Sequence, residues 1–123
     1  MTRAALEAIA YQVRDVLDAM QKDSGAPIKE LRVDGGATAN NFLMQFQSDI
    51  LQTKIKRPKI IETTAIGAAF LAGLAIGFWE SEEELQALWE SDKDFEPKME
   101  VEKVDYFLHF WHKAVERSKN WVE

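Results

Sequence analysis

The sequence predicts an α/β fold that is rich in helix and holds two short parallel strands, in the order α-β-α-β-α-α-α. Apolar residues recur at helical spacing along most of the chain. Two short stretches of strand character, 30–33 and 53–56, enclose one of these helices. A strand–helix–strand unit of this length implies a parallel pair with a right-handed crossover. The chain has 123 residues, which suits a single domain.

Composition and charge exclude several kinds of protein. Hydrophobic residues make up 46% of the chain and charged residues 29%, which is typical of a globular domain. The net charge is −6, so a nucleic-acid backbone would repel the chain, and we expect no nucleic-acid partner. The absence of cysteine excludes a disulfide framework and a thiolate metal site. No secretory apolar stretch follows Met1, and we expect a cytoplasmic protein.

The first predicted helix lies near the N-terminus. Apolar residues between Leu6 and Met20 recur at i, i+3, i+4 and i+7, which indicates an amphipathic helix. Gly25 followed by Pro27 ends it, in the order expected past a helix C-terminus. The first strand, 30–33, comes next.

The second predicted helix covers 38–51, and its buried side is formed by Phe42, Leu43, Phe46 and Ile50. The second strand, 53–56, is ended by Pro58.

The stretch 63–79, TTAIGAAFLAGLAIGFW, contains no charged residue and predicts a helix over 64–77. A membrane-spanning helix needs about 20 apolar residues, more than this stretch supplies. Its flanks are Glu62 and Glu80, and no basic cluster marks a cytoplasmic side. We therefore expect a buried core helix rather than a membrane span.

The last third of the chain is predicted to be helical. Ser81 and Glu84 form a capping box that opens a short helix, whose apolar contacts are made by Leu85, Leu88 and Trp89. A loop around Phe95 and Pro97 leads to a final helix over 101–121. The buried stripe of this helix is Val104, Phe107, Leu108, Trp111 and Val115.

The glycine pair Gly35–Gly36 follows a predicted strand and precedes a helix. In open α/β sheets, ligands bind beyond the carboxyl ends of strands, and a helix N-terminus attracts phosphate. Glycine also lets the backbone approach a nucleotide that a Cβ would hold off. Asn40, in the first helical turn, is placed to hydrogen-bond a base or ribose.

On local chemistry alone, Asp34-Gly35-Gly36 can also be interpreted as a tight turn in a helical interaction module. A Rossmann-like domain that binds a nucleotide or a methyl donor is a further alternative. The missing third glycine counts against that alternative.

Both histidines lie in the last predicted helix. They fall on one face with two acidic residues, in the series Asp105, His109, His112 and Glu116, a spacing that can bind a metal. That face lies opposite the buried stripe, so we interpret the series as solvated i, i+4 pairs and predict no metal site. No motif for nucleophilic catalysis is present, and we predict no catalytic residue.

Three long segments resemble the C-terminal region of the glycerol kinase family, which belongs to the sugar kinases with the actin-like ATPase fold. They are RAALEAIAYQVRDVLDAM, LRVDGGATANNFLMQFQSDIL and TTAIGAAFLAGLAIGFW, and they occur in the family's order. The implied fold is an incomplete ribonuclease H-like domain over 1–123, with a core at 1–78 and a helical extension at 79–123. Three preceding strands are expected to lie upstream of Met1.

The resemblance implies that ATP or ADP binds with Mg²⁺, whose ligands lie outside this chain. The backbone at Gly36 would lie against the nucleotide, Asn40 would contact its adenosine side, and Gly35 would shape the turn. The catalytic base and the glycerol site belong to the upstream part, so we expect the isolated chain to be inactive. Sibling sugar kinases remain alternatives for the parent enzyme. An uncovered sheet edge and apolar face would favour a homodimer.

Overall fold

The computed structural model describes residues 1–59, 63–88 and 91–121. Its elements are, in order, α1 (Thr2–Ser24), β1 (Glu30–Arg32), the 3₁₀ helix η1 (Gly36–Ala39), α2 (Asn41–Leu51), β2 (Lys54–Pro58), α3 (Thr63–Ala75), α4 (Glu82–Ala87), β3 (Ser91–Phe95) and α5 (Val101–Ser118). The helix-rich α/β character predicted from the sequence is confirmed.

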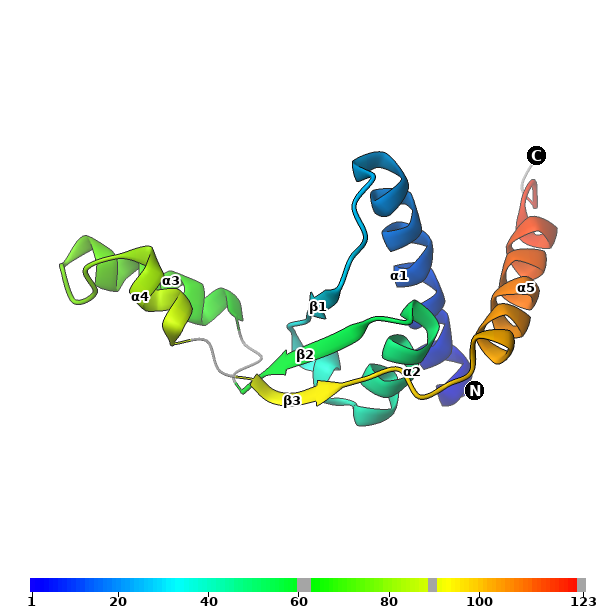
Figure 1. Ribbon diagram of the computed structural model, residues 1–123, viewed down its shortest axis with the longest axis horizontal. Helices are drawn as coiled ribbons and strands as arrows, with labels where there is room; N and C mark the ends of the chain where they lie inside the picture. The colour runs from blue at the N-terminus through cyan, green and yellow to red at the C-terminus, as the bar shows by residue number, and fades with distance from the viewer. Residues whose placement is uncertain (60–62, 89–90, 122–123) are drawn as a thin grey trace.

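The sheet has three strands in the order β1-β2-β3 (Figure 1). β1 and β2 are parallel, as predicted, with Leu31 opposite Ile55. β3 runs antiparallel to β2 and pairs Phe95 with Ile55. The prediction of two strands, and with it the order α-β-α-β-α-α-α, is therefore wrong. The missed strand, SDKDF, holds a single apolar residue, and its pairing with β2 is what makes it a strand.

Helices α1 and α2 cover one face of the sheet. Their side chains form a core with the inward residues of β2 and β3, namely Leu17, Leu43, Met44, Leu51, Ile55 and Phe95. On the opposite face the Lys56 ammonium lies 3.2 Å from Glu30, and the Lys54 ammonium lies 3.0 Å from Asp94. The uncovered face of the sheet is thus charged.

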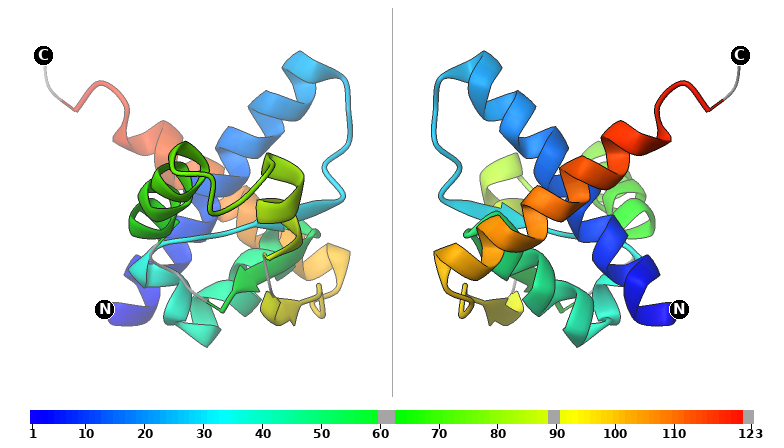
Figure 2. Two further views of the ribbon diagram at one scale, coloured as in Figure 1. Left: turned by 90° about the vertical axis from the view of Figure 1, so that its left-hand side faces the viewer. Right: turned by 90° about the vertical axis from the view of Figure 1, so that its right-hand side faces the viewer.

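α5 crosses α1 on the side of the helical layer away from the sheet (Figure 2). A second core cluster lies between α1, α2 and α5, and consists of Ala10, Tyr11, Phe46, Ile50, Val104 and Leu108. Phe107 and Trp111 are partly buried against this cluster. The predicted buried stripe of the last helix is therefore largely confirmed.

Several predicted boundaries shift. Gly25 ends α1 in the left-handed conformation, with φ 68°, as its position predicted. The second helix begins at Asn41 rather than at residue 38, because residues 36–39 form a 3₁₀ helix instead. Phe42 was expected on its buried side but is 40% exposed. β2 includes Pro58, which was expected to end the strand earlier.

The hairpin of α3 and α4 projects away from the sheet (Figure 1). Leu71 is 70% exposed and Ile76 is 81% exposed, so the prediction of a buried core helix is wrong within the described residues. The absence of charged residues shows that the helix has an apolar surface, but it does not show that other residues pack against that surface. Leu88, expected to make apolar contacts, is also exposed, and Trp89 lies outside the described residues.

The hairpin is held together by its own side chains. Phe70 meets Trp79 edge to face, with ring centroids 5.2 Å apart. Ser81 caps α4 by accepting the Glu84 N–H at 3.3 Å, which confirms the predicted N-terminus of that helix. In the part of the chain that the structure describes, no helix has the length and apolar character to cross a bilayer. The division into a core at 1–78 and an extension at 79–123 stays a prediction.

Candidate functional site

A glycine turn follows β1 at the carboxyl ends of the two parallel strands. Gly35 has φ 92° and ψ 166°, a combination that side-chain-bearing residues rarely adopt. Its carbonyl accepts two hydrogen bonds from Thr38, one from the backbone N–H at 3.1 Å and one from the hydroxyl at 2.6 Å. Thr38 itself is only 5% exposed. The turn is thus closed by a buried threonine.

The position of Gly36, unlike that of Gly35, does not require glycine for its backbone conformation. Its φ is not positive, and a Cβ built on it would meet no atom within 4 Å. Neither backbone conformation nor packing against the described residues demands glycine at this position. The backbone of Gly36 is exposed at the surface, so the space beside it is open to a ligand.

Asn40 was predicted to lie in the first turn of the helix, but it is the N-cap of α2. Its side-chain oxygen accepts a hydrogen bond from the Leu43 N–H at 3.0 Å, the usual role of asparagine at this position. The rest of the carboxamide is an NH₂ group with two donors, and the residue is exposed. The side-chain oxygen of Asn40 therefore stabilises the start of α2, while its NH₂ group lies at the surface.

Arg57 of β2 reaches the same turn, and sequence reasoning missed it. Its guanidinium donates to the Thr38 carbonyl at 3.0 Å and to the Asn41 side-chain oxygen at 2.7 Å. It also contacts the Asp92 carboxylate of β3 at 2.9 Å. One feature of the sequence could have pointed to it. Arg57 follows the buried strand residue Ile55 by two positions and hence lies on the same face of the strand.

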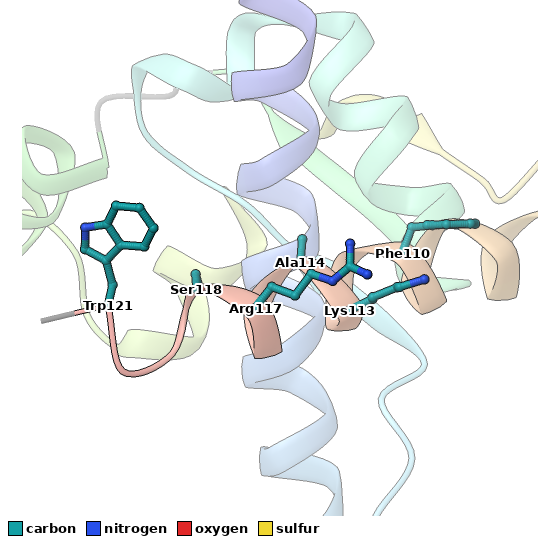
Figure 3. Close-up of a pocket in the computed structure, with 6 residues that line it drawn as sticks. All are labelled: Phe110, Lys113, Ala114, Arg117, Ser118 and Trp121. Carbon is teal, nitrogen blue, oxygen red and sulfur yellow. The ribbon is translucent and has the colours of Figure 1, made fainter.

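Among the hollows of the described surface, two bear on the choice of site. One, of about 500 Å³, is lined by residues of α5 and the chain after it, including Lys113 and Arg117 (Figure 3). It shares no residue with the glycine turn. The other, of about 210 Å³, is lined by Ala39, Arg57, Pro58, Lys59 and Asp92 and lies beside the turn.

The histidine face of α5 is solvated, as predicted, but its pairing differs from the prediction. His112 was expected to pair with Glu116; instead its Nε2 lies 3.0 Å from the Asp15 carboxylate of α1. The indole N–H of Trp111 donates to the other oxygen of Asp15 at 2.8 Å. Among the described residues, no three acidic or histidine side chains gather closely enough to hold a metal ion.

Comparison with known families places the glycine turn in a larger context. Residues 1–76 match the C-terminal domain of the FGGY family of carbohydrate kinases. The chain belongs to this family. The match includes β1, η1, α2 and β2, and therefore every residue of the glycine turn.

Individual relatives of this FGGY chain agree on one branch of the family. It is 61% identical over 121 residues to a glycerol kinase of Caldanaerobacter subterraneus subsp. tengcongensis. That alignment covers 98% of the chain and 24% of the relative. The chain thus spans about a quarter of the length of the curated relatives it matches.

Solved structures of FGGY kinases share its fold. The glycerol kinase of Plasmodium falciparum, solved with ADP, superposes with a TM-score of 0.82 at 42% identity, over 98% of this chain and 24% of that one. A ligand-bound xylulose kinase of Lactobacillus acidophilus superposes with a TM-score of 0.73 at 23% identity, over 96% of this chain and 25% of that one. The second likeness shows the fold alone.

Proposed function

We propose that this chain is the C-terminal, nucleotide-binding portion of a glycerol kinase. The complete enzyme would transfer the γ-phosphate of ATP to glycerol, giving glycerol 3-phosphate. The level of identity supports glycerol kinase over its siblings, because it is 61% to a glycerol kinase and 23% to a xylulose kinase. By the same proposal, the sheet and its helices belong to a ribonuclease H-like domain of a cytoplasmic enzyme.

The open space beside Gly36, in a turn at the carboxyl ends of the two parallel strands, is the observation that carries the nucleotide site, and Gly67 of α3 has open space without that location. Glycine at this position has no cause among the described residues, since its φ is not positive and a Cβ would meet nothing. A nucleotide packed against the backbone gives it a cause, because any side chain would then occupy the ligand's place. Gly35 shapes the turn, and the NH₂ group of Asn40 is available to the adenosine side.

The proposed division of labour leaves the chemistry to other parts of the enzyme. ATP supplies the phosphoryl group, and this chain would bind and orient the nucleotide. Within the described residues no acidic cluster fits a metal, so we assign no Mg²⁺ ligand here. Phosphoryl transfer depends on positioning both substrates together. We therefore expect the 123-residue chain alone to form no glycerol 3-phosphate. A homodimer of the chain stays a prediction, which sedimentation would test.

The test is ADP affinity in the complete kinase, measured by calorimetry for two variants at the site and one control. Gly36→Val fills the proposed contact, and Asn40→Ser keeps an N-cap while it removes the NH₂ donors. Gly67→Val is the control, because a Cβ added to Gly67 on α3 would also meet no atom within 4 Å.

We expect both site variants to raise the Kd for ADP by about tenfold or more, equivalent to roughly 1.4 kcal/mol. The Kd of the Gly67→Val control should stay at its parent value. An unchanged ADP affinity in Gly36→Val would show that the turn is only structural. Phosphorylation of another polyol in preference to glycerol would instead reassign the substrate within the family.

A further inference from the structure

The Arg57 side chain joins three segments that lie far apart in the sequence. It belongs to the carboxyl end of β2, and it contacts both the residues around η1 and β3. The side chain is only 11% exposed, although it carries a full charge. A buried charge of this kind is retained only where its partners compensate for the lost water.

Toward the glycine turn, Arg57 binds the segment that runs from η1 into α2. One terminal nitrogen donates to the Thr38 carbonyl at 3.0 Å, to the Ala39 carbonyl at 3.4 Å and to the Asn41 side-chain oxygen at 2.7 Å. These acceptors flank Asn40 on both sides. Thr38 in turn donates twice to the Gly35 carbonyl, so the contacts continue into the glycine turn.

Toward β3, the same guanidinium is held from its other edge. The ε nitrogen and the second terminal nitrogen both donate to the Asp92 carboxylate, at 3.2 and 2.9 Å. The guanidinium carbon lies 5.3 Å from the centre of the Phe95 ring, in cation–π distance. Asp92 and Phe95 therefore fix the plane of the guanidinium, and that plane decides where its donors point.

We propose that Arg57 is a positioning residue for nucleotide binding, which holds η1 and the start of α2 against β3 and so sets the places of Gly36 and Asn40. The inference rests on the proposed nucleotide site and deepens it. Arg57 does not touch the nucleotide. It acts through the carbonyls of residues 38 and 39 and through Asn41, and only a planar fork of donors reaches both this segment and Asp92.

The experiment compares two conservative substitutions in the complete kinase. Arg57→Lys keeps the charge but loses the fork. Arg14→Lys is the matched control, since Arg14 also binds a backbone carbonyl, that of Ile50 at 2.6 Å, together with the carboxylate of Asp18. Each variant is characterised by its melting temperature, its Kd for ADP and its KM for glycerol.

We expect Arg57→Lys to raise the Kd for ADP by about tenfold, while the KM for glycerol changes by less than about twofold. Arg14→Lys should lower the melting temperature without changing the Kd for ADP. If Arg57→Lys leaves the Kd unchanged, or if both variants raise it equally, the positioning role is overturned.

A second variant covers the case in which Arg57→Lys does not fold. Asp92→Asn removes the charge that orients the guanidinium from a side chain that is 49% exposed. It is expected to raise the Kd for ADP by about threefold, and an unchanged Kd would contradict the inference.

The Gly36→Val result separates the two proposals. A loss of ADP affinity in Gly36→Val, with none in the Arg57 and Asp92 variants, would overturn the positioning role alone. No loss in Gly36→Val would overturn the nucleotide site itself, and the positioning role with it.

Discussion

Two adjacent glycines in this chain have different physical reasons to be glycine. Gly35 adopts φ 92°, a conformation that any Cβ makes costly. Gly36 has no positive φ, and a Cβ there would meet no described atom within 4 Å, so neither strain nor packing among the described residues requires glycine. From the sequence the pair was one motif, because backbone angles cannot be read from the letters. The structure divides it into a residue that shapes the turn and a residue that is exposed beside it, for which we propose contact with the nucleotide.

This difference predicts that the same substitution destabilises the chain at one position and leaves its stability unchanged at the other. Gly35→Ala should destabilise the chain by about 1–3 kcal/mol, because alanine is strained at a positive φ. Gly36→Ala should leave the free energy of unfolding within about 0.5 kcal/mol of the parent value. Urea denaturation of both variants measures the difference. Equal losses would contradict the separate roles of the two residues.

At the scale of elements, the patterns of apolar residues predicted the secondary structure of each element more reliably than its burial. α1 was predicted with its end, because Gly25 marks the end chemically and apolar residues recur at i, i+3, i+4 and i+7. Its buried face was predicted only in part, since Val16 and Met20 of that pattern are exposed. β3 was missed since Asp92 and Asp94 gave it the composition of a loop. Their charges are matched only in the fold, by Arg57 and Lys54.

The candidate site was predicted in part for similar reasons. Gly35, Gly36 and Asn40 are close in sequence, and the structure keeps them together in one turn. Arg57 contacts that turn from another strand, and no local sequence pattern predicts this contact. The prediction that α3 is buried was wrong, because the absence of charge shows that a segment is apolar but does not show what packs against it.

The end of α3 depends on a close contact between Gly73 and Trp79. A Cβ on Gly73 would collide with the Trp79 ring, which also packs on Phe70 and Phe78. Gly73→Ala should therefore displace the indole and destabilise the hairpin by about 1–3 kcal/mol. The measurement is the Trp79 indole resonance in an NMR spectrum. Its neighbour substitution Ala72→Gly is the control, and a Trp79 resonance unmoved in Gly73→Ala would refute the contact.

At the scale of the whole molecule, the helical layer and the sheet respond alike to high pH. Burial raises the pKa of Tyr11, which lies between Phe46 and Trp111, and the Glu7 charge adds to the shift. On the sheet, the hydrogen bond that Lys54 donates to the Asp94 carboxylate raises the pKa of Lys54. Both groups bind their protons more tightly in the folded chain than in the unfolded one.

The sign of this linkage predicts a loss of stability in alkali. The contribution of a raised pKa is complete below the ordinary value, 10.0 for tyrosine, and disappears as the pH rises through the folded pKa. The melting temperature should therefore fall above pH 10, and it should fall less steeply in Tyr11→Phe, which cannot ionise. Parallel pH profiles of the two proteins would contradict the role of Tyr11.

The antiparallel pairing of β2 with β3 places Pro58 opposite Ser91. The chain therefore leaves the sheet and returns to it at neighbouring points, and everything between them, including α3 and α4, is inserted at one position of the core. We therefore expect the sheet and the helices packed on it to fold without the α3–α4 hairpin. A short turn in place of residues 59–90 would close β2 and β3 into a simple β-hairpin, and would yield a smaller protein that keeps the glycine turn, Arg57 and Asp92.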